Sequence, residues 1–434
     1  MLASVIRNPE ISYPSRKYNF SPSESYPEYP FDDISFEQNN VYKSVRNCFI
    51  QAGLDGENIG KTNWNPLKDY VNKRDSVFVL CNFVYHRRQH ETRDQFFAKC
   101  THASILRAII DYIIIAAGRD GIIAFGNAPL QSCNWEKVLA DTGALTLLDF
   151  YKKVNINVEA RDLRLFIAER SIAGNTHSIE RKHEDEGVMV SLGEKSFLNH
   201  LYPSKQSLRF RVSDYNPDRI EKFHDLDRHD YVINRIILES DVIFSVPKLK
   251  THEKVGITVG LKGFVGCVGH KDCLAHHRFG PPSMKGDEYP NNGKLQVLMS
   301  QFHDYVYRRN YPRLLQNTFE ILDRASRHIA RRYFNKIQGG AWYGNDTAWR
   351  MTLDLARIVS FADRNGKLKN FKQRRHIMLI DGVTSGEGGL DHNPAHPRHA
   401  ATSASAGRLS GRSRFWRGGG GRSTCANTCS NNAG

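Results

Sequence analysis

The sequence has no run of apolar residues long enough to cross a membrane. Its longest apolar run, residues 105–117, is interrupted by Arg107 and Asp111 and is far shorter than the ~20 residues that a spanning helix needs. The first twenty residues also lack an apolar core followed by a small-residue cleavage site, so we expect no signal peptide. Together these absences predict a cytoplasmic protein.

Clustered cysteines are also missing. The eight cysteines are scattered along the chain, and none has the CxxC spacing of a zinc ribbon or an iron–sulfur module. In a reducing compartment we expect most of them to be free thiols. The sequence therefore contains no iron–sulfur cluster motif.

Acidic residues are outnumbered by basic ones, with 46 Asp and Glu against 61 Lys and Arg, which gives a net charge of +15. A basic surface attracts anions of many kinds, including nucleic acid, acidic lipid, nucleotide sugars and acidic glycans. However, an RNP-type aromatic motif, C2H2 finger spacing and a heptad with a basic region are all absent. We therefore expect no sequence-specific binding of nucleic acid.

Strand and helix patterns alternate along the chain. Short apolar runs rich in β-formers predict strands at 76–80, 121–125, 241–246 and 376–380, and apolar periodicity predicts helices at 104–117 and 231–240. This alternation predicts an α/β fold with a largely parallel sheet flanked by helices. In such sheets, ligands bind in the crevice outside the carboxyl ends of the strands.

We divide the chain into three parts. Residues 1–40, rich in Pro, Ser and Tyr, are expected to form an extended arm, and residues 41–389 an α/β domain with a basic helical insertion at about 291–340. The insertion is either a solvated helix packed on the body or an interfacial helix lying on an anionic membrane. Residues 390–434, rich in Arg, Gly and Ser, have too little apolar surface to fold and are predicted to be a disordered tail.

The motif VPKLKTH follows the strand at 241–246. In an extended chain, Lys248, Lys250 and His252 project to the same side, where they suit a phosphate or a carboxylate. Five glycines and Lys262 follow within the next 17 residues. Such glycines let backbone N–H groups approach an anion closely, or they simply serve turns and tight packing.

A histidine-rich stretch comes next. His270, Asp272, His276 and His277 offer four nitrogen or oxygen ligands within eight residues, a set that suits a divalent metal such as zinc, iron or manganese. The spacing matches no known zinc-protease pattern. The same histidines can instead contact substrate, act as acid and base near neutral pH, or serve structure.

Two outlying segments complete the candidate site. Arg350 follows a predicted helix start and favours an anion, although a solvated charged face explains it equally well. Asp381 and Glu387 lie on a glycine-rich loop, expected to be flexible, where either carboxylate can act as a general base or metal ligand. The candidate catalytic residues are His252, His270, His277 and Asp381, and the candidate anion-binding residues are Lys248, Lys250, Lys262 and Arg350.

These motifs resemble the bacterial and archaeal family called domain of unknown function 362. The resemblance covers about residues 75–388 and rests on THASILRAI (101–109), GNAPLQ (126–131), VPKLKTH (246–252), GITVGLKGFVG (256–266) and DGVTSGEG (381–388). It implies an α/β domain but no established reaction. HKDCLAHHRFG and GAWYGNDTAWRM are similar to a subgroup found with bacterial surface-polysaccharide genes. Some relatives carry a ferredoxin-type module, whose clustered cysteines are absent here.

The sequence departs from the family pattern near residue 389. The family pattern continues with a glycine- and proline-containing turn, an apolar strand and a helix, whereas this chain turns into the Arg/Gly/Ser tail. Our hypothesis is a frameshift or a sequencing error at this point. Resequencing the coding DNA tests it, since an unbroken frame that still encodes the Gly418–Gly421 run would refute it.

The function that we favour from the sequence is that of an enzyme, or a degenerate enzyme, in surface-polysaccharide metabolism. It would act on an anionic small molecule or glycan precursor. One alternative is a non-catalytic partner that docks on an anionic membrane surface, or in an assembly, through the Arg-rich helix near residue 324. A second alternative is a redox accessory protein, which requires a bound cluster or flavin.

Overall fold

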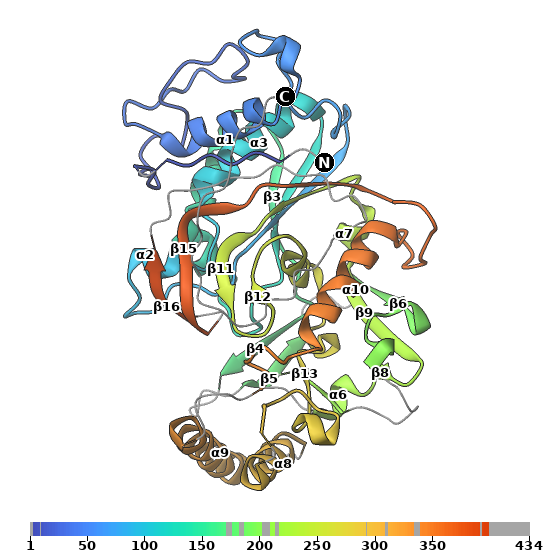
Figure 1. Cartoon of the computed structure of the whole chain (residues 1–434). Coiled ribbons are helices and arrows are strands. Elements are labelled where there is room, and N and C mark those ends of the chain that lie inside the picture. Colours follow the sequence, from blue (N-terminus) through green and yellow to red (C-terminus); the bar gives the residue numbers. More distant parts are fainter. Residues whose placement is uncertain are drawn as a thin grey trace, which may run out of the picture.

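A five-stranded parallel sheet lies at the centre of the molecule (Figure 1). The computed structural model describes residues 3–8, 10–170, 176–181, 186–201, 209–212, 217–291, 293–308, 311–333, 339–390 and 393–398. The strands of the sheet, in spatial order, are β14 (Arg375–Met378), β10 (Val242–Val246), β1 (Ser76–Cys81), β2 (Ile122–Asn127) and β3 (Val158–Asp162). The predicted α/β fold with a largely parallel sheet is therefore confirmed.

The order of the strands reverses beside β1. From β1 the chain builds outward through β2 to β3, and it then returns to place β10 and β14 on the other side of β1. In open α/β sheets, ligands bind outside the carboxyl ends of the strands at such a reversal. In this chain those ends are Cys81 of β1 and Val246 of β10.

Side chains alternate between the two faces of the sheet. Val77 and Val79 of β1 join the apolar core that contains α1 (Asn40–Gln51) and α3 (Ala103–Ala117). Phe78 and Leu80 join the opposite core, together with α7 (Arg235–Glu239) and α10 (Ala348–Phe361). Helices therefore cover both faces, which is why the strands are apolar at nearly every position.

The N-terminal arm covers α3, whose charged pair is buried as a result. Arg107 Nε donates to Asp111 Oδ2 at 2.9 Å, as the i,i+4 spacing predicts, but both side chains have no exposed surface. The arm supplies further partners for this guanidinium, namely Asp33 and the main-chain oxygen of Asn19. The arm is thus an integral part of this core.

A second layer of strands continues from the central sheet. β11 (Lys248–His252) follows β10 after Pro247, and β15 (Asp381–Leu390) follows β14. The neighbouring strands β10 and β14 of the central sheet thus continue into β11 and β15, which pair again beyond it. The glycine-rich segment after Asp381 is thus a strand, and the prediction of a flexible loop is wrong. β12 (Gly256–Ile257) and β16 (Asn393–Arg398) complete this layer, whose order is β12-β11-β15-β16. Residues 399–434 of the predicted tail lie outside the described residues.

The basic insertion forms two helices, α8 (Lys294–Arg308) and α9 (Arg313–Tyr333). They pack side by side at the end of the molecule opposite α1 (Figure 1). Within the described ranges, no helix combines the length and the apolar character that crossing a membrane requires.

The remaining helices and strands are short. The predicted helix at 231–240 is in fact the end of a strand followed by the short helix α7. The remaining helices are α2 (Arg93–Phe97), α4 (Trp135–Thr142), α5 (Ala144–Lys153) and α6 (Pro217–Ile220). The remaining strands are β4 (Phe166–Arg170), β5 (Thr176–Arg181), β6 (Gly187–Ser191), β7 (Phe210–Arg211), β8 (His224–Asp225), β9 (Arg228–Asn234) and β13 (His277–Arg278).

Candidate functional site

The three basic residues of VPKLKTH share one face of β11, as their spacing predicts. That face is turned inward, since Lys248 is 0% exposed, Lys250 3% and His252 7%. The side chains therefore do not line an open edge of the sheet.

Lys248 belongs to a buried cluster with Asp381 and Tyr13. Its ammonium lies 3.0 Å from Asp381 Oδ2 and donates to the Tyr13 hydroxyl at 2.7 Å. The Tyr13 hydroxyl in turn donates to Asp381 Oδ1 at 2.8 Å. Burial, together with the charge of Asp381, raises the pKa of Tyr13 well above its ordinary value. The Tyr13 hydroxyl therefore keeps its proton and donates it to the hydrogen bond with Asp381.

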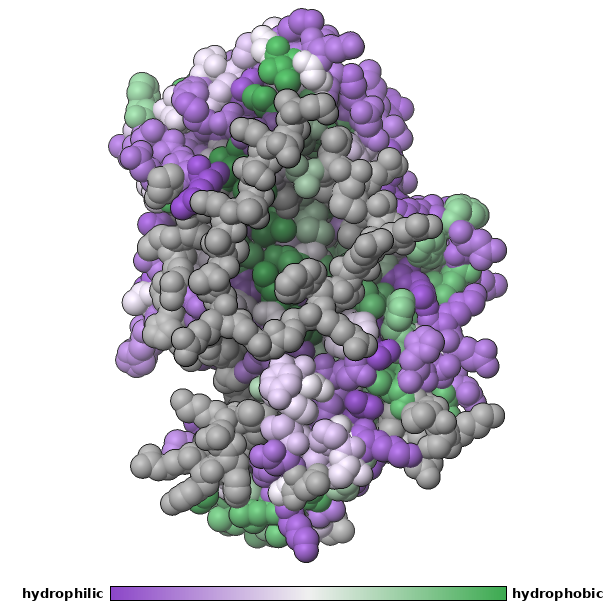
Figure 2. Space-filling model, in the orientation of Figure 1, coloured by the Kyte–Doolittle hydropathy of each residue, from purple (hydrophilic) through white to green (hydrophobic). Residues whose placement is uncertain are grey.

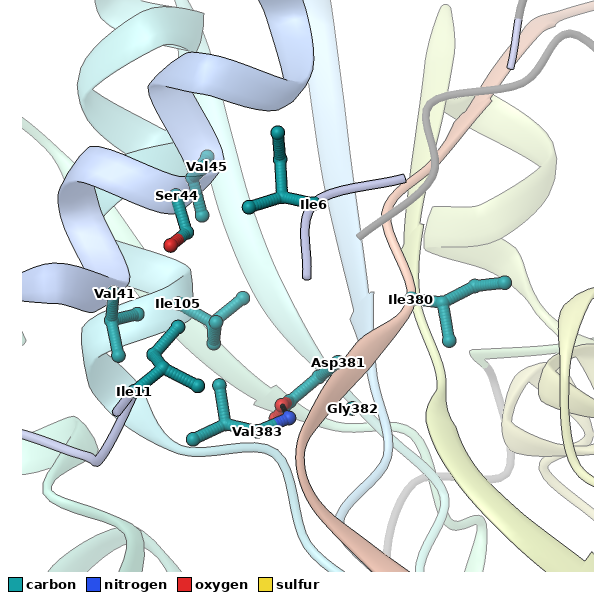
Figure 3. A pocket seen from close by; sticks show the side chains of 10 residues that line it. All are labelled: Ile6, Ile11, Val41, Ser44, Val45, Ile105, Ile380, Asp381, Gly382 and Val383. Carbon is teal, nitrogen blue, oxygen red and sulfur yellow. Dashed lines mark hydrogen bonds between the residues drawn. The ribbon is translucent and has the colours of Figure 1, made fainter. Parts of the chain in front are cut away.

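The charge of Lys248 is thus neutralised within the protein. Burial lowers the pKa of this lysine, while the attraction of Asp381 opposes that change. A void of about 10 Å³ borders Asp381 and is lined mainly by apolar side chains such as Ile11 and Val383 (Figure 3). A void of this size holds at most about one water molecule. Lys248 and Asp381, both predicted to contribute to a ligand site, instead form one buried ion pair with this small void beside it.

The loop after β1 joins the two central strands where the strand order reverses. Thr101 Oγ accepts from the main-chain N–H of Asn82 at 2.9 Å and donates to the Val246 oxygen at 3.1 Å, so it joins the ends of β1 and β10. His102 caps α3 through its Nδ1, which accepts from Ser104 N at 3.0 Å. The conspicuous THASILRAI segment therefore holds the two central strands and the first helix together.

Lys262 lies on the 3₁₀ helix η5 (Gly260–Cys267), which packs over the carboxyl ends of the central strands. The oxygen of Gly266 accepts from Ala128 N at 2.7 Å, and a Cβ at this glycine would stand 3.1 Å from that of Asn127. A side chain at this glycine would therefore crowd the close packing between η5 and the end of β2.

Lys271 is not among the residues predicted from the sequence. Its hydrogen bonds connect η5 to the end of the sheet. Its ammonium donates to the Ala128 oxygen at 2.9 Å and to the Val265 oxygen at 3.2 Å. Burial, followed by the positive charge of Lys262, lowers the pKa of Lys271 to about 7. A lysine with such a pKa is partly neutral at physiological pH and can accept a proton.

The end of β11 and the histidine stretch lie within electrostatic reach of one another at His276. Burial lowers the pKa of this histidine well below its ordinary value, and the positive charges of Lys254 and Lys262 and the ring of His252 act in the same direction. Lys254, Lys262 and His276 are half-buried and His252 is buried. We call these four residues the basic cluster. They come from the turn after β11, from η5 and from the segment before β13.

Hydrogen bonds assign different tautomers to the two histidines of the basic cluster. His252 Nδ1 accepts from the main-chain N–H groups of Lys254 and Val255, at 3.1 and 3.3 Å, so its Nε2 carries the proton. His276 Nδ1 donates to the Leu274 oxygen at 2.9 Å, so its Nε2 carries the lone pair. One ring thus offers a donor and the other an acceptor.

The other histidine-stretch residues are placed apart from one another. His270 lies 3.9 Å from Asp272, and two phenylalanine rings pack against the His270 ring. The Asp272 carboxylate also pairs with Arg219 at 3.5 Å. His277 is buried in β13, where Gly340 packs against its ring. Among the residues that the structure describes, no three His, Cys, Asp or Glu side chains are arranged to hold a metal ion. The four predicted metal ligands therefore do not form one group.

Arg350 is engaged within its own surroundings. Its Nε lies 3.1 Å from Asp346 Oδ1, one turn earlier in the chain, and its guanidinium lies 4.5 Å from the centre of the Trp349 ring. It also donates to the Phe197 oxygen at 3.2 Å. None of these partners belongs to the basic cluster, so the structure does not join Arg350 to the other anion-binding candidates.

The sequence matches the model of the family described as "Domain of unknown function (DUF362)" over residues 164–407, which is more than half of the chain. The chain belongs to this family. The matched region of this DUF362 protein contains the basic cluster, Lys271 and the strand that begins at Asp381. The link to surface-polysaccharide genes is not part of this match and stays a prediction.

Comparison with other proteins adds little beyond the family. A crystal structure of a protein from Thermotoga maritima, a Northeast Structural Genomics Consortium target, is similar at 12% identity with a TM-score of 0.30. The similarity covers 79% of this chain and 52% of the other, so this chain spans about half the length of that protein. No curated protein matches the sequence.

Proposed function

We propose that this DUF362 protein is an enzyme, or keeps the site of one, that binds an anionic small molecule at its basic cluster. The observation that carries the proposal is that His252 at the end of β11, Lys254 just after it and Lys262 on η5 all act electrostatically on half-buried His276. Groups of like sign repel one another, and an anion bound among them relieves that repulsion.

The position of the basic cluster supports the same proposal. β11 continues directly from β10, and η5 packs against β1 and β10 at the reversal point of the sheet. Ligands of open α/β sheets bind outside the carboxyl ends of the strands at this point. The basic cluster thus occupies the part of the fold that is suited to a ligand.

The proposed chemistry is proton transfer on the bound anion. His252 Nε2–H donates a hydrogen bond to the ligand, Lys254 and Lys262 balance its charge, and His276 Nε2 accepts a proton. The lone pair of His276 is available at neutral pH because the pKa of this residue is lowered. A phosphorylated glycan precursor, such as a nucleotide sugar, has the negative charge that this arrangement requires.

Calorimetric titration of the full-length chain at low ionic strength tests the proposal. The probes are uridine diphosphate, the anionic part of many nucleotide sugars, and inorganic phosphate. We expect Lys262→Ala and Lys254→Ala each to weaken binding by roughly tenfold, since a charge-assisted hydrogen bond contributes about 1.5–3 kcal/mol. The matched control is Lys152→Ala, which removes an exposed lysine from α5. Equal affinities for the parent and all three variants would contradict the proposal.

A further inference from the structure

The long helix α9 distributes its side chains in an unusual way. Five of its large apolar residues face solvent and are each at least half exposed, namely Leu314, Leu315, Ile321, Leu322 and Ile329, whereas Phe319 packs against Tyr311. Its two acidic residues, Glu320 and Asp323, have no exposed surface. A helix of a water-soluble protein normally buries its apolar face and exposes its charges. In α9 this arrangement is reversed.

The exposed apolar residues form one stripe. With 3.6 residues per turn, positions 314, 318, 321, 322, 325 and 329 fall on one side of α9, and positions 316, 320 and 323 on the other. The second side faces α8, where the carboxylate of Asp323 lies 3.0 Å from His303 Nδ1. The polar groups therefore hold the two helices together and leave the apolar stripe turned outward.

Helix α8, which packs against α9, also exposes apolar side chains. Leu295, Leu298 and Tyr305 are between 40% and 61% exposed. Eight of the 19 exposed large apolar side chains of the described residues thus lie on α8 and α9, which have 15 and 21 residues. Figure 2 shows apolar surface along the lower edge of the molecule, where these helices lie. Such a concentration of exposed apolar surface marks an interaction site.

The charge of this surface is positive. The sequence of α9 contains five arginines and one histidine, and its only acidic residues are the two buried ones. Arg324 and His328 are exposed beside the stripe, and α8 begins with the exposed Lys294. A partner for this surface must therefore be apolar and anionic at once.

We infer that the α8–α9 pair binds the surface of a membrane that contains anionic lipid. A helix of 21 residues is about 31 Å long and can lie flat in the interface, with its apolar stripe in the headgroup region and the exposed Arg324 at lipid phosphates. A second copy of the chain fits less well, because a symmetric contact places the same positive surface on both sides. This docking surface is separate from the basic cluster and goes beyond the proposed function.

Co-sedimentation of the full-length chain with vesicles tests this inference. The vesicles contain phosphatidylcholine alone or with phosphatidylserine at a molar ratio of 7:3. We expect binding to the anionic vesicles and roughly tenfold weaker partitioning for the double variant Ile321→Ser/Leu322→Ser, which removes apolar contact with the bilayer. Arg324→Glu is expected to weaken partitioning and its dependence on phosphatidylserine.

Two controls separate membrane docking from other causes. Phe371→Ser changes an exposed apolar residue outside the two helices and is expected to bind like the parent, and so is Lys262→Ala in the basic cluster. The inference is overturned if the parent binds neither kind of vesicle, or if the Ile321→Ser/Leu322→Ser variant binds like the parent. It is also overturned if the stripe variants change only a monomer–dimer equilibrium measured by light scattering.

Discussion

Lys248 Nζ lies 3.0 Å from Asp381 Oδ2, and both side chains are completely buried at the point where β11 and β15 begin. The two residues are opposite one another in the parallel register, because each follows one of two neighbouring strands of the central sheet. Tyr13 completes the cluster from the N-terminal arm. The cluster therefore joins three distant parts of the chain at the carboxyl edge of the sheet.

Lys248→Met leaves the Asp381 carboxylate buried without its cation. We expect the free energy of unfolding to fall by about 3–5 kcal/mol, the usual effect of removing one partner of a buried ion pair. The double variant Lys248→Met/Asp381→Leu removes both charges and is expected to recover most of that loss. Urea unfolding of Lys248→Met, Asp381→Leu and the double variant measures the coupling free energy between the two residues. Additive losses would show that the pair makes no joint contribution.

Tyr13→Phe removes the hydroxyl that bonds both partners of the ion pair. Because Lys248 and Asp381 each lose a buried hydrogen bond, we expect the free energy of unfolding to fall by about 1–3 kcal/mol. Tyr343→Phe is the matched control, since Tyr343 is 98% exposed, and its effect should stay within about 0.5 kcal/mol. The role of Tyr13 is refuted if both variants unfold at the same urea concentration as the parent.

The sequence predicted the centre of the fold well. The strands at 76–80, 121–125, 241–246 and 376–380 were recognisable because strands buried on both faces are almost continuously apolar. The shared face of the VPKLKTH lysines followed from the two-residue period of a strand. The helix predicted at 231–240 was wrong, because Tyr231 to Asn234 pair with β6 and this pairing outweighs local helix preference.

The environment of the candidate residues could not be predicted in the same way. Lys248 was expected to hold an external anion because nothing in its local sequence indicates Asp381, which lies 133 positions away, or Tyr13, which lies 235 positions away. The inverted exposure of α9 also depends on which side of the helix meets α8. Both outcomes are set by tertiary packing, which local periodicity does not specify.

The buried histidine pair His224 and His229 gives a prediction about acid sensitivity. His224 Nε2–H donates to the Cys273 oxygen at 2.7 Å, so its Nδ1 accepts from His229 Nδ1–H at 3.2 Å. Burial lowers the pKa of His224 to about 3 and that of His229 to about 4. The unfolded chain binds more protons than the folded chain between these values and about 6.5, so stability is complete above pH 6.5 and declines as the pH falls toward 4 and 3.

NMR titration of the imidazole signals checks this prediction directly. At pH 5 both rings should still be neutral, because the pKa of His224 is about 3 and that of His229 about 4. Urea unfolding should also show a smaller loss of stability between pH 6.5 and 4.5 for His229→Phe than for the parent. Titration of both rings near pH 6.5 would contradict the assignment.

Lys271 gives a test of the same sign in a more alkaline pH range. Its folded-state pKa of about 7 lies below the ordinary lysine value of 10.5, so the unfolded chain binds more protons between these two values. The contribution of Lys271 to stability is therefore most favourable above pH 10.5, and it declines as the pH falls to 7.

Lys271→Met loses two hydrogen bonds to carbonyl oxygens at every pH, at about 1 kcal/mol each, but it no longer has a charge to bury. Relative to the parent, this variant should be more stable at pH 7 than at pH 10 in paired urea unfolding experiments. A stability difference that is the same at pH 7, 8.5 and 10 would show that Lys271 keeps an ordinary pKa, and it would remove this lysine from the candidate proton acceptors.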